Sequence, residues 1–308
     1  MAILRPVVAF WMFCLVLFLV VAQPAPADGT NSWAFAAFAD NRSFPERSPG
    51  AFEGVVAEIR DMRVNPEPGF PAIEFVVGCG DLKLAADGHR NWDLWVETFK
   101  TSAVPPCFYP LVGNWDGEDV DFNRKEVLPR QKNVSTNDPY RYTVDWKNVR
   151  LVVSRDLEYV EKAITNAPRT IEHVFVADHY PIFPRNAHEG KPDASDTAFW
   201  NMLVKHNDIV RAFLVGHTHT YSRMRVADPK GKVVEDEKSF PDEAHGIYQV
   251  DCGNAGRSSH GETSTTIVEV SVDGPKVRFR VIQAPNETPT QFKVRDQWEI
   301  RGTPVEAK

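Results

Sequence analysis

The stretch IVRAFLVGHTHTYSR, residues 209–223, changes character part-way along its length. Its first half is an apolar run typical of a buried strand, and its second half is the polar segment GHTHTYSR. Two imidazoles, those of His217 and His219, follow the apolar run directly. Because ligands in open α/β sheets gather at the carboxyl ends of strands, this stretch predicts a strand that brings two histidines to a site.

Other apolar runs also lead into a polar side chain. The runs are residues 33–40, 73–81, 107–114 and 173–181, and the polar residues are Asp40, Asp81, Asn114 and His179. A single acidic residue or histidine after a strand is weak evidence for a site. Since every one of these apolar runs ends in a polar side chain, we expect the side chains to converge at one edge of a sheet.

The segments between these runs have helical periodicity. Apolar residues recur at helical spacing in residues 51–62, 91–100, 157–167 and 197–206, whereas residues 142–154 are typical of two paired strands around a turn. Strands alternating with helices indicate an α/β layered domain with a largely parallel central sheet. Later strand-like runs, from GIYQVDCGNAG to KVRFRVI, predict a second, mixed sheet.

The residue types at the strand ends are those that bind transition metals. Carboxylates, an amide oxygen and imidazoles together suit Zn, Fe, Mn and similar ions. Such a set holds two ions when one carboxylate bridges them, and paired ions clamp a phosphoryl group and activate a water. The sequence therefore predicts a metal centre for phosphoryl chemistry.

Five short segments carry a more specific pattern. In chain order they are Asp40-Asn41-Arg42, Gly80-Asp81-Leu82-Lys83, Gly113-Asn114-Trp115-Asp116, His179-Tyr180-Pro181 and Gly216-His217-Thr218-His219. In this order they resemble the blocks of the calcineurin-like metallophosphoesterases, and GHTHTYSR is similar to the purple-acid-phosphatase variant. The resemblance covers about Trp33 to Ile282. It implies an α/β fold, a four-layer sandwich of two mixed β-sheets flanked by helices.

The resemblance also implies a role for each strand-end residue. Asp81 is expected to bridge two ions, either divalent or trivalent, of Fe, Mn or Zn. The second ion is expected to bind Asn114, His179 and His217, and the first ion to bind Asp40 and His219.

Two positions depart from the family pattern. Arg42 stands where the first block has a histidine, and its guanidinium has no lone pair for a metal. The first ion then keeps three protein ligands, or Arg42 fills part of that site and grips a phosphate or neutralises carboxylates. Trp115 replaces the histidine of the third block, and an indole cannot shuttle protons. His89, His188 and His260 are either substitutes for that histidine or plain surface residues.

Further candidates lie in the same blocks. The candidate catalytic residues are Asp81, Arg42, Trp115 and Asp116. The candidate substrate-binding residues are Arg42, Tyr221 and Arg223. Tyr221 and Arg223 directly follow GHTH, so either a contact with phosphate or a structural role suits them.

These observations predict a metal-dependent phosphoesterase that hydrolyses small phosphomono- or diesters by attack of a metal-bound hydroxide. Two alternatives remain open because of Arg42 and Trp115. In the first, the fold is degenerate and binds a ligand with negligible turnover. In the second, the enzyme keeps one stable ion and exchanges the other.

Composition narrows the class of protein. The chain has 308 residues, 43% of them hydrophobic, which is typical of a globular protein and excludes a wholly disordered one. Its 35 basic and 42 acidic residues leave a net charge of −7, so we expect no nucleic-acid polymer as partner.

The N-terminus has the features of a secretory signal peptide. Arg5 precedes an uncharged apolar block, residues 7–22, that is short for a membrane span, and small residues at Ala22 and Ala27 offer cleavage sites. We expect a signal peptide at residues 1–27, a phosphoesterase domain at residues 28–308, and a secreted or periplasmic protein. Without cleavage the segment would be a membrane anchor.

Cysteine usage leaves the redox state open. Cys14 lies in the expected signal peptide, and Cys79, Cys107 and Cys252 remain in the mature chain. An odd number leaves at least one thiol free or paired between chains. Either a disulfide between Cys79 and Cys107 or two buried free thiols suits the apolar runs around them.

Overall fold

The computed structural model describes residues 32–41, 50–85, 90–100, 106–184, 192–227, 233–236, 246–256 and 263–301. The chain divides into a unit of residues Met1–Thr30 and a unit of residues Asn31–Lys308, and the fold described here is that of the second unit. Among the described residues, no helix combines the length and the apolar content needed to cross a bilayer.

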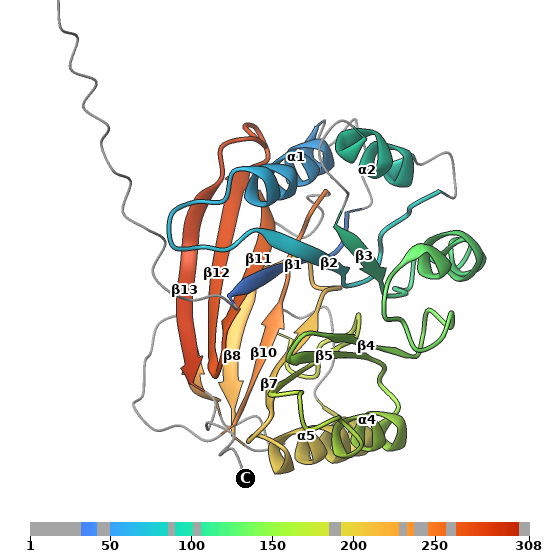
Figure 1. Ribbon diagram of the computed structural model, residues 1–308, viewed down its shortest axis with the longest axis vertical. Helices are drawn as coiled ribbons and strands as arrows, with labels where there is room; N and C mark the ends of the chain where they lie inside the picture. The colour runs from blue at the N-terminus through green and yellow to red at the C-terminus, as the bar shows by residue number, and fades with distance from the viewer. Residues whose placement is uncertain are drawn as a thin grey trace, which may run out of the picture. The chain divides into compact units, whose positions relative to one another are not determined.

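The first sheet joins the beginning of the domain to its end (Figure 1). It contains β1 (Trp33–Phe38), β2 (Ile73–Gly78), β3 (Cys107–Pro110), β11 (Ser264–Asp273), β12 (Lys276–Pro285) and β13 (Lys293–Arg301). The spatial order is β13-β12-β11-β1-β2-β3. β1, β2 and β3 are parallel, whereas β11, β12 and β13 extend the sheet with antiparallel pairing.

The second sheet is built from the middle of the chain. It contains β4 (Tyr142–Trp146), β5 (Val149–Val153), β6 (His173–Ala177), β7 (Val210–Val215), β8 (Ser222–Val226), β9 (Val233–Asp236) and β10 (Ile247–Asp251). The spatial order is β4-β5-β6-β7-β10-β8-β9. β5, β6, β7 and β10 are parallel, and the strands outside them are antiparallel.

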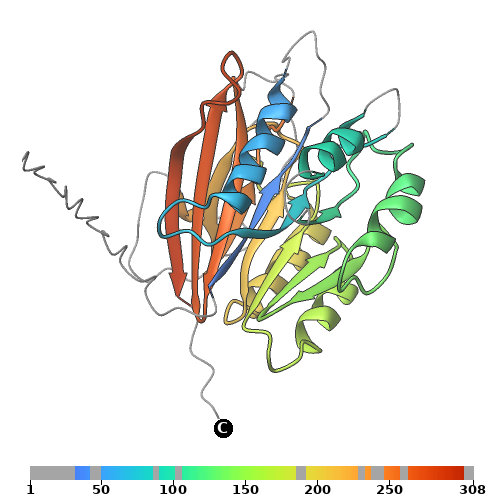
Figure 2. The same cartoon turned by 45° about the horizontal axis from the view of Figure 1, so that its top comes forward.

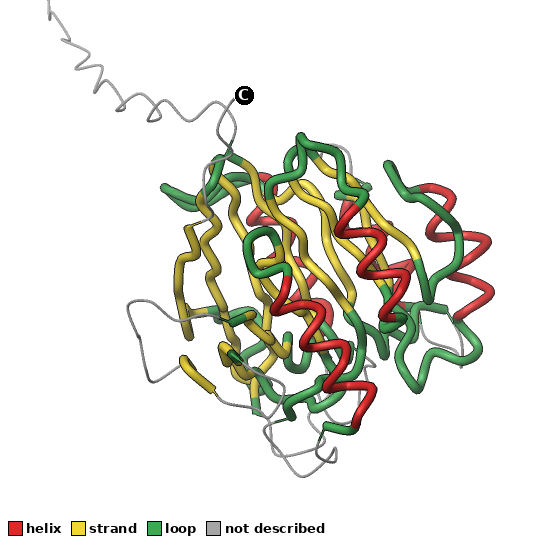
Figure 3. The backbone as a smooth tube through the Cα atoms, turned by 90° about the horizontal axis from the view of Figure 1, so that it is seen from below, coloured by secondary structure: helices red, strands yellow, loops and turns green. Residues whose placement is uncertain are grey.

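Helices cover the outer faces of both sheets (Figures 2 and 3). They are α1 (Ala51–Val64), α2 (Asn91–Phe99), α4 (Leu157–Thr165) and α5 (Ala194–Lys205); a short helical segment consists of α3 (Val120–Phe122), η1 (Asn123–Val127) and η2 (Leu128–Arg130). α1 and α2 share one apolar cluster with the first sheet, and α4 and α5 share another with the second sheet. A third cluster fills the space between the sheets, so the layers run helix, sheet, sheet, helix.

The sequence of β1 shows why its strand is apolar at every position. Trp33, Phe35 and Ala37 point to the cluster between the sheets, whereas Ala34 and Phe38 point to the cluster beneath α1 and α2. Because a strand presents alternate residues to opposite faces, a strand covered on both sides needs apolar residues throughout. Phe35 meets Phe175 of the second sheet edge to face, with ring centroids 5.1 Å apart.

The α/β fold class and the two mixed sheets flanked by helices are confirmed. The expected hairpin is also present as β4 and β5, and the four expected helices are α1, α2, α4 and α5. We expected the late strands to form a second sheet apart from the early ones, and this is wrong. The late strands β11, β12 and β13 share the first sheet with the early strands β1, β2 and β3. Each sheet therefore has its own parallel strands: β1, β2 and β3 at one edge of the first sheet, and β5, β6, β7 and β10 within the second.

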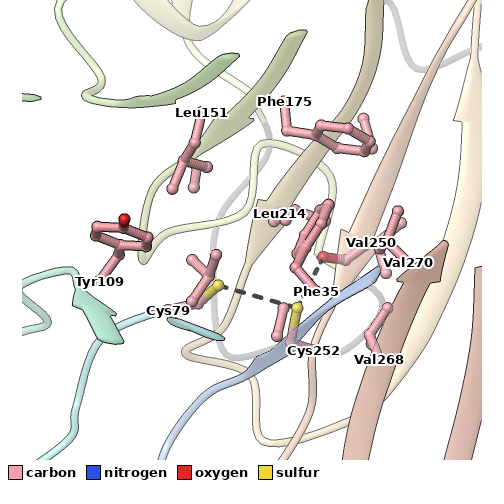
Figure 4. Packing of buried hydrophobic residues seen from close by; sticks show 14 of the residues in the cluster. Phe35, Cys79, Tyr109, Leu151, Phe175, Leu214, Val250, Cys252, Val268 and Val270 are labelled. Atoms are coloured by element: carbon pink, nitrogen blue, oxygen red, sulfur yellow. Dashed lines mark hydrogen bonds between the residues drawn. The ribbon is translucent and has the colours of Figure 1, made fainter. Parts of the chain in front are cut away.

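Of the two states considered for the cysteines, the structure has the free thiols, with Cys79 buried and Cys107 half-buried. Cys79, Cys107 and Cys252 are all free thiols, so the Cys79–Cys107 disulfide is absent. The Sγ atoms of Cys79 and Cys252 lie 4.0 Å apart in the core between the sheets (Figure 4). The Cys79 thiol and burial raise the pKa of the Cys252 thiol well above its usual value.

Candidate metal centre

The strand ends from both sheets meet at one edge of the sandwich. β1, β2 and β3 of the first sheet lead into Asp40, Asp81 and Asn114, and β6 and β7 of the second lead into the three histidines. Backbone hydrogen bonds join neighbouring loops at the end of each sheet. Asp40 N donates to Gly80 O at 3.1 Å in the first sheet, and Gly216 N donates to His179 O at 2.9 Å in the second. The His217 N–H crosses to the other sheet and donates to Asp40 Oδ2 at 2.9 Å.

Asp40, Asp81 and His179 form the centre of this edge. All three are buried, and one ligand atom from each lies within 4.8 Å of the others. His179 Nε2 lies 3.6 Å from Asp81 Oδ1, and His219 Nε2 lies 3.4 Å from Asp40 Oδ1. Two carboxylates and two imidazoles from four loops therefore face one small space.

His179 and His217 converge on the amide oxygen of Asn114. His179 Nε2 lies 3.1 Å from Asn114 Oδ1, His217 Nδ1 lies 3.0 Å from the same oxygen, and the two ring nitrogens are 3.2 Å apart. The other nitrogen of His179, Nδ1, lies 2.9 Å from the carbonyl oxygen of Cys79. A carbonyl accepts, so Nδ1 carries the proton and the Nε2 lone pair of a neutral ring points at the oxygens.

Residues beside the cluster adopt an unusual backbone conformation. φ is 56° at Asp40, 55° at Asp81, 71° at His217 and 57° at His219. This left-handed region costs a non-glycine residue on the order of 1–3 kcal/mol, and such strain clusters at functional sites. The tight turns after the strands direct these side chains back across the sheet edge.

Glycines make room for the cluster. A Cβ at Gly113 would lie 2.3 Å from Asp81 Oδ1, and a Cβ at Gly80 would lie 2.4 Å from His179 Nδ1. A Cβ at Gly216 would lie 2.5 Å from the Cβ of Ala39. Glycine is therefore required at these positions of three sequence blocks, because a side chain there would clash with residues at the site.

Asp116 holds two of the loops together. Its side chain is fully buried; Oδ1 accepts from Leu82 N at 2.8 Å and Lys83 N at 3.0 Å, and Oδ2 accepts from Gly113 N at 2.9 Å. Burial raises the pKa of Asp116 to about 6, and the backbone hydrogen bonds oppose this increase. These contacts give Asp116 a positioning role for Asp81 and Asn114.

The donors at this edge fit a metal ion. Carboxylate oxygens, an amide oxygen and an imidazole lone pair all present negative charge to the same space, and such groups repel one another unless a cation lies between them. The His179 Nδ1 contact with a backbone carbonyl is the orienting bond that metal-binding histidines make. The residues that would hold metal are Asp40, Asp81, Asn114, His179, His217 and His219.

A cavity of about 870 Å³ opens beside Asn114 and Tyr180. The side chain of Tyr180 is 39% exposed, and its ring centroid lies 4.7 Å from that of His217. Arg155 lies in the same cavity, pairs with Asp178 at 3.2 Å and Asp196 at 2.5 Å, and donates to Tyr180 O at 2.8 Å. Sequence analysis missed Tyr180 and Arg155 as site residues; the aromatic-proline pair after His179 was the available signal for Tyr180.

The structure corrects the positions expected for Tyr221 and Arg223. Both are buried, and both bond Asp296 of β13: Tyr221 OH at 2.6 Å and Arg223 Nε at 2.9 Å. The Arg223 guanidinium also lies over the Trp298 ring, 4.7 Å from its centroid. A fully buried, ion-paired arginine packed on an aromatic ring is closed to a substrate arriving from solvent, which favours the structural role for Arg223.

The remaining sequence candidates are only partly described. The backbone N–H of Trp115 donates to Asp81 Oδ1 at 2.8 Å, and half of the residue is exposed. Arg42, His89, His188 and His260 lie outside the described residues, as does the expected signal peptide.

Comparison with known proteins agrees with the site. A model of the calcineurin-like phosphoesterase family matches residues 35–221, more than half of the chain. The chain belongs to the calcineurin-like phosphoesterase family. The expected family is thereby confirmed, the matched residues span all the blocks from Asp40 to His219, and Asp40, Asp81 and His179 could together hold a metal ion.

One solved structure, that of PhoD, shows the fold, and other solved structures match with lower TM-scores. PhoD matches this calcineurin-like phosphoesterase with a TM-score of 0.58 and 9% identity over 92% of this chain and 74% of that chain. A predicted phosphoesterase from Streptococcus pneumoniae matches with a TM-score of 0.39 and 12% identity, covering 88% of this chain and 98% of that one. Vps29 from Chaetomium thermophilum matches with a TM-score of 0.42 and 11% identity, covering 88% and 98%. A search of curated protein sequences gave no significant match.

Proposed function

We propose that this protein is an exported, metal-dependent phosphoesterase that hydrolyses small phosphomono- or diesters. The convergence of two carboxylates, an amide oxygen and three imidazoles from both sheets is the observation that carries the proposal. Ions of the Fe, Mn or Zn type would be held by Asp81 together with two sets of residues. Asn114, His179 and His217 would hold one ion, Asp40 and His219 would hold the other, and Asp81 would be shared.

Bound ions would supply two kinds of chemistry here: they would lower the pKa of a water and withdraw charge from phosphoryl oxygens. The chain itself keeps its ligands in place. The backbone carbonyl of Cys79 orients His179, and the backbone N–H of Trp115 orients Asp81. Asp116 holds together the two loops that carry Asp81 and Asn114. Arg42 is proposed to bind phosphate oxygens, a task that suits a bidentate guanidinium.

The cavity beside Asn114 is proposed to hold the organic part of the substrate. Tyr140, Tyr180 and Phe199 contribute aromatic surface to its lining. Its charged lining residues are one cation, Arg155, and two carboxylates, so it offers no surplus positive charge to a polyanion. This supports a small phosphoester, and not a nucleic-acid polymer, as substrate.

The test compares the wild type with Asp81→Asn after loading with Mn, Fe or Zn, using p-nitrophenyl phosphate and bis-p-nitrophenyl phosphate. We expect Asp81→Asn to lose about 10²-fold or more in rate, because an amide is a poorer bridge than a carboxylate. Asp121→Asn is the matched control, since Asp121 is an exposed carboxylate paired with Lys125. Equal and metal-insensitive rates in wild type and Asp81→Asn would refute the proposal.

Trp115 favours a second candidate, a phosphoesterase fold that binds a ligand without turnover. Its backbone N–H donates to Asp81 Oδ1, and half of the residue is exposed, at a position where the family has a proton-carrying histidine. This candidate predicts at most one ion per chain by elemental analysis and no hydrolysis of either nitrophenyl ester. Two ions per chain together with turnover would exclude it. One tightly held ion, with activity that rises on addition of metal, would indicate an enzyme that exchanges its second ion.

Export is proposed from the N-terminal sequence alone. The apolar block of residues 7–22 and the small residues after it predict cleavage after Ala22 or Ala27. Mass spectrometry of the protein recovered outside the cytoplasm of its host would show a new N-terminus at one of these positions. An intact Met1 would indicate an anchor instead of a signal peptide.

A further inference from the structure

A second cavity, of about 760 Å³, lies far from the metal centre. Glu74 near the start of β2 and Cys107 at the start of β3 line it, whereas Asp81 and Asn114 follow the other ends of these strands. A strand rises about 3.3 Å per residue, so Glu74 and the end of β2 at Gly78 are separated by roughly 13 Å. The cavity and the metal centre thus occupy opposite ends of the first sheet.

The walls of this cavity are largely aromatic. Trp92, Trp95 and Phe99 of α2 and Trp146 of β4 are all part of the lining. Trp95 and Phe99 pack against each other with centroids 4.8 Å apart and are almost fully buried, so they are held in place. Trp92 and Trp146 are partly exposed, and the Trp146 Nε1–H donates to Glu74 Oε2 at 2.7 Å. Partly exposed aromatic rings in a fixed setting suit a planar apolar group.

The charged lining residues are mainly basic. They are Arg63, Lys100, Arg130 and Lys132, against the single carboxylate of Glu74. Glu74 already pairs with Lys147, which is not part of the lining. Lys100 and Arg130 pair with Glu97 and Glu126 on the surface, and such exposed pairs are weak enough to yield to a ligand. A basic cavity on a chain with a net charge of −7 favours an anion.

We propose that this cavity is a second ligand site, independent of the metal centre, that binds a small organic anion with a planar aromatic body. Its volume is within the range of about 300–1,000 Å³ that small-molecule sites occupy. The aromatic walls hold the ring, and the lysines and arginines at the rim hold the acidic group. Cys107 is the half-buried thiol in the lining, which makes it a reporter of occupancy.

The probe is 8-anilinonaphthalene-1-sulfonate, an aromatic anion whose fluorescence rises on binding, titrated into the full-length protein. We expect one saturable site per chain. Lys100→Glu is expected to weaken binding roughly fivefold, because it removes an attraction and adds a repulsion. Lys125→Glu is the matched control: both lysines are 66% exposed and both pair with a carboxylate on their own helical segment, but Lys125 is not part of the lining.

Two further measurements locate the probe and test its charge. Bound probe should slow the alkylation of Cys107 by iodoacetamide, measured by peptide mass spectrometry, and added phosphate should not displace the probe. The uncharged analogue N-phenyl-1-naphthylamine should bind Lys100→Glu and wild type equally. Absence of saturable binding, equal weakening by Lys100→Glu and Lys125→Glu, or unchanged alkylation of Cys107 would each overturn the proposal.

Discussion

Gly113→Ala tests whether the shape of the loops, apart from the ligands themselves, controls the metal centre. The added Cβ would lie 2.3 Å from Asp81 Oδ1 and 2.4 Å from Asp81 N, whereas ordinary contacts begin at 3.4 Å. The difference between 3.4 Å and 2.3 Å requires a displacement of about 1 Å. Gly113 N is itself bonded to Asp116 Oδ2 at 2.9 Å, so Asp81 is expected to give way, and its backbone must move together with its carboxylate.

This displacement has two expected costs. Overpacking of this kind lowers the free energy of unfolding by about 1–3 kcal/mol, which urea denaturation monitored by circular dichroism would measure. Misplacing a ligand typically lowers metal affinity about 10- to 100-fold, which titration calorimetry with Mn²⁺ on the metal-free protein would measure.

Gly117→Ala in the same loop is the control. A Cβ at Gly117 meets nothing within 4 Å, so this variant is expected to bind Mn²⁺ as the wild type does and to unfold at the same urea concentration or slightly above it. If Gly113→Ala bound Mn²⁺ within twofold of the wild type, the close approach of Gly113 to Asp81 would not control the site, and our reasoning would be wrong.

Three other substitutions probe residues around the site and the core. Asp116→Asn puts an amide N–H where a carboxylate oxygen now accepts a backbone N–H, so we expect a loss of about 1–3 kcal/mol in unfolding free energy and weaker Mn²⁺ binding, measured by the same two assays. Tyr221→Phe removes the hydroxyl that bonds Asp296 and should cost about 1 kcal/mol of stability with no change in KM; a raised KM would restore a substrate-binding role. Burial raises the pKa of Glu269 to about 7, although its ion pair with Arg280 opposes the increase, so the folded state binds this proton more tightly than the unfolded state. The contribution of Glu269 to the free energy of unfolding should therefore fall by about 3 kcal/mol as the pH rises from 4.5 to 7, and stay level above that. Glu269→Gln should remove this part of the pH dependence of the unfolding free energy, measured by urea denaturation at several pH values. An unchanged pH dependence would contradict the assignment.

Most of the elements could be predicted from local patterns. The apolar runs that became β1, β2, β6 and β7, and the periodic segments that became α1 and α4, are visible because burial of one or both faces dictates which positions are apolar. The arrangement of strands between the sheets could not be predicted. β11 pairs with β1 across more than 220 residues of chain, and no local pattern encodes which strands become neighbours.

For the metal centre, too, some features could be predicted from the sequence and others could not. The sequence indicated Asp40, Asp81, Asn114, His179, His217 and His219 as candidate ligands, because metal-binding residue types follow several apolar strands in the order of the family's blocks. Their assembly from two different sheets, and the left-handed φ of Asp40 and His217, appear only in three dimensions. For Arg223 the sequence left a phosphate contact and a structural role open, and the structure favours the second, because the antiparallel addition of β13 supplies Asp296 and Trp298 to pair with it and bury it.

By itself the sequence determined most of the strands and helices, to which family the chain belongs and which side chains are chemically able to hold a metal. It did not indicate β8, β9, β13 or the short helical segment from Val120 to Arg130. These properties depend on residue type and on spacing along a few turns of chain. The tertiary structure alone decided that Cys79 faces Cys252, that Tyr180 lies against His217 beside a cavity, and that a basic aromatic cavity lies at the other end of the first sheet. These contacts join residues tens to hundreds of positions apart, and only the packing of the two sheets brings such residues together.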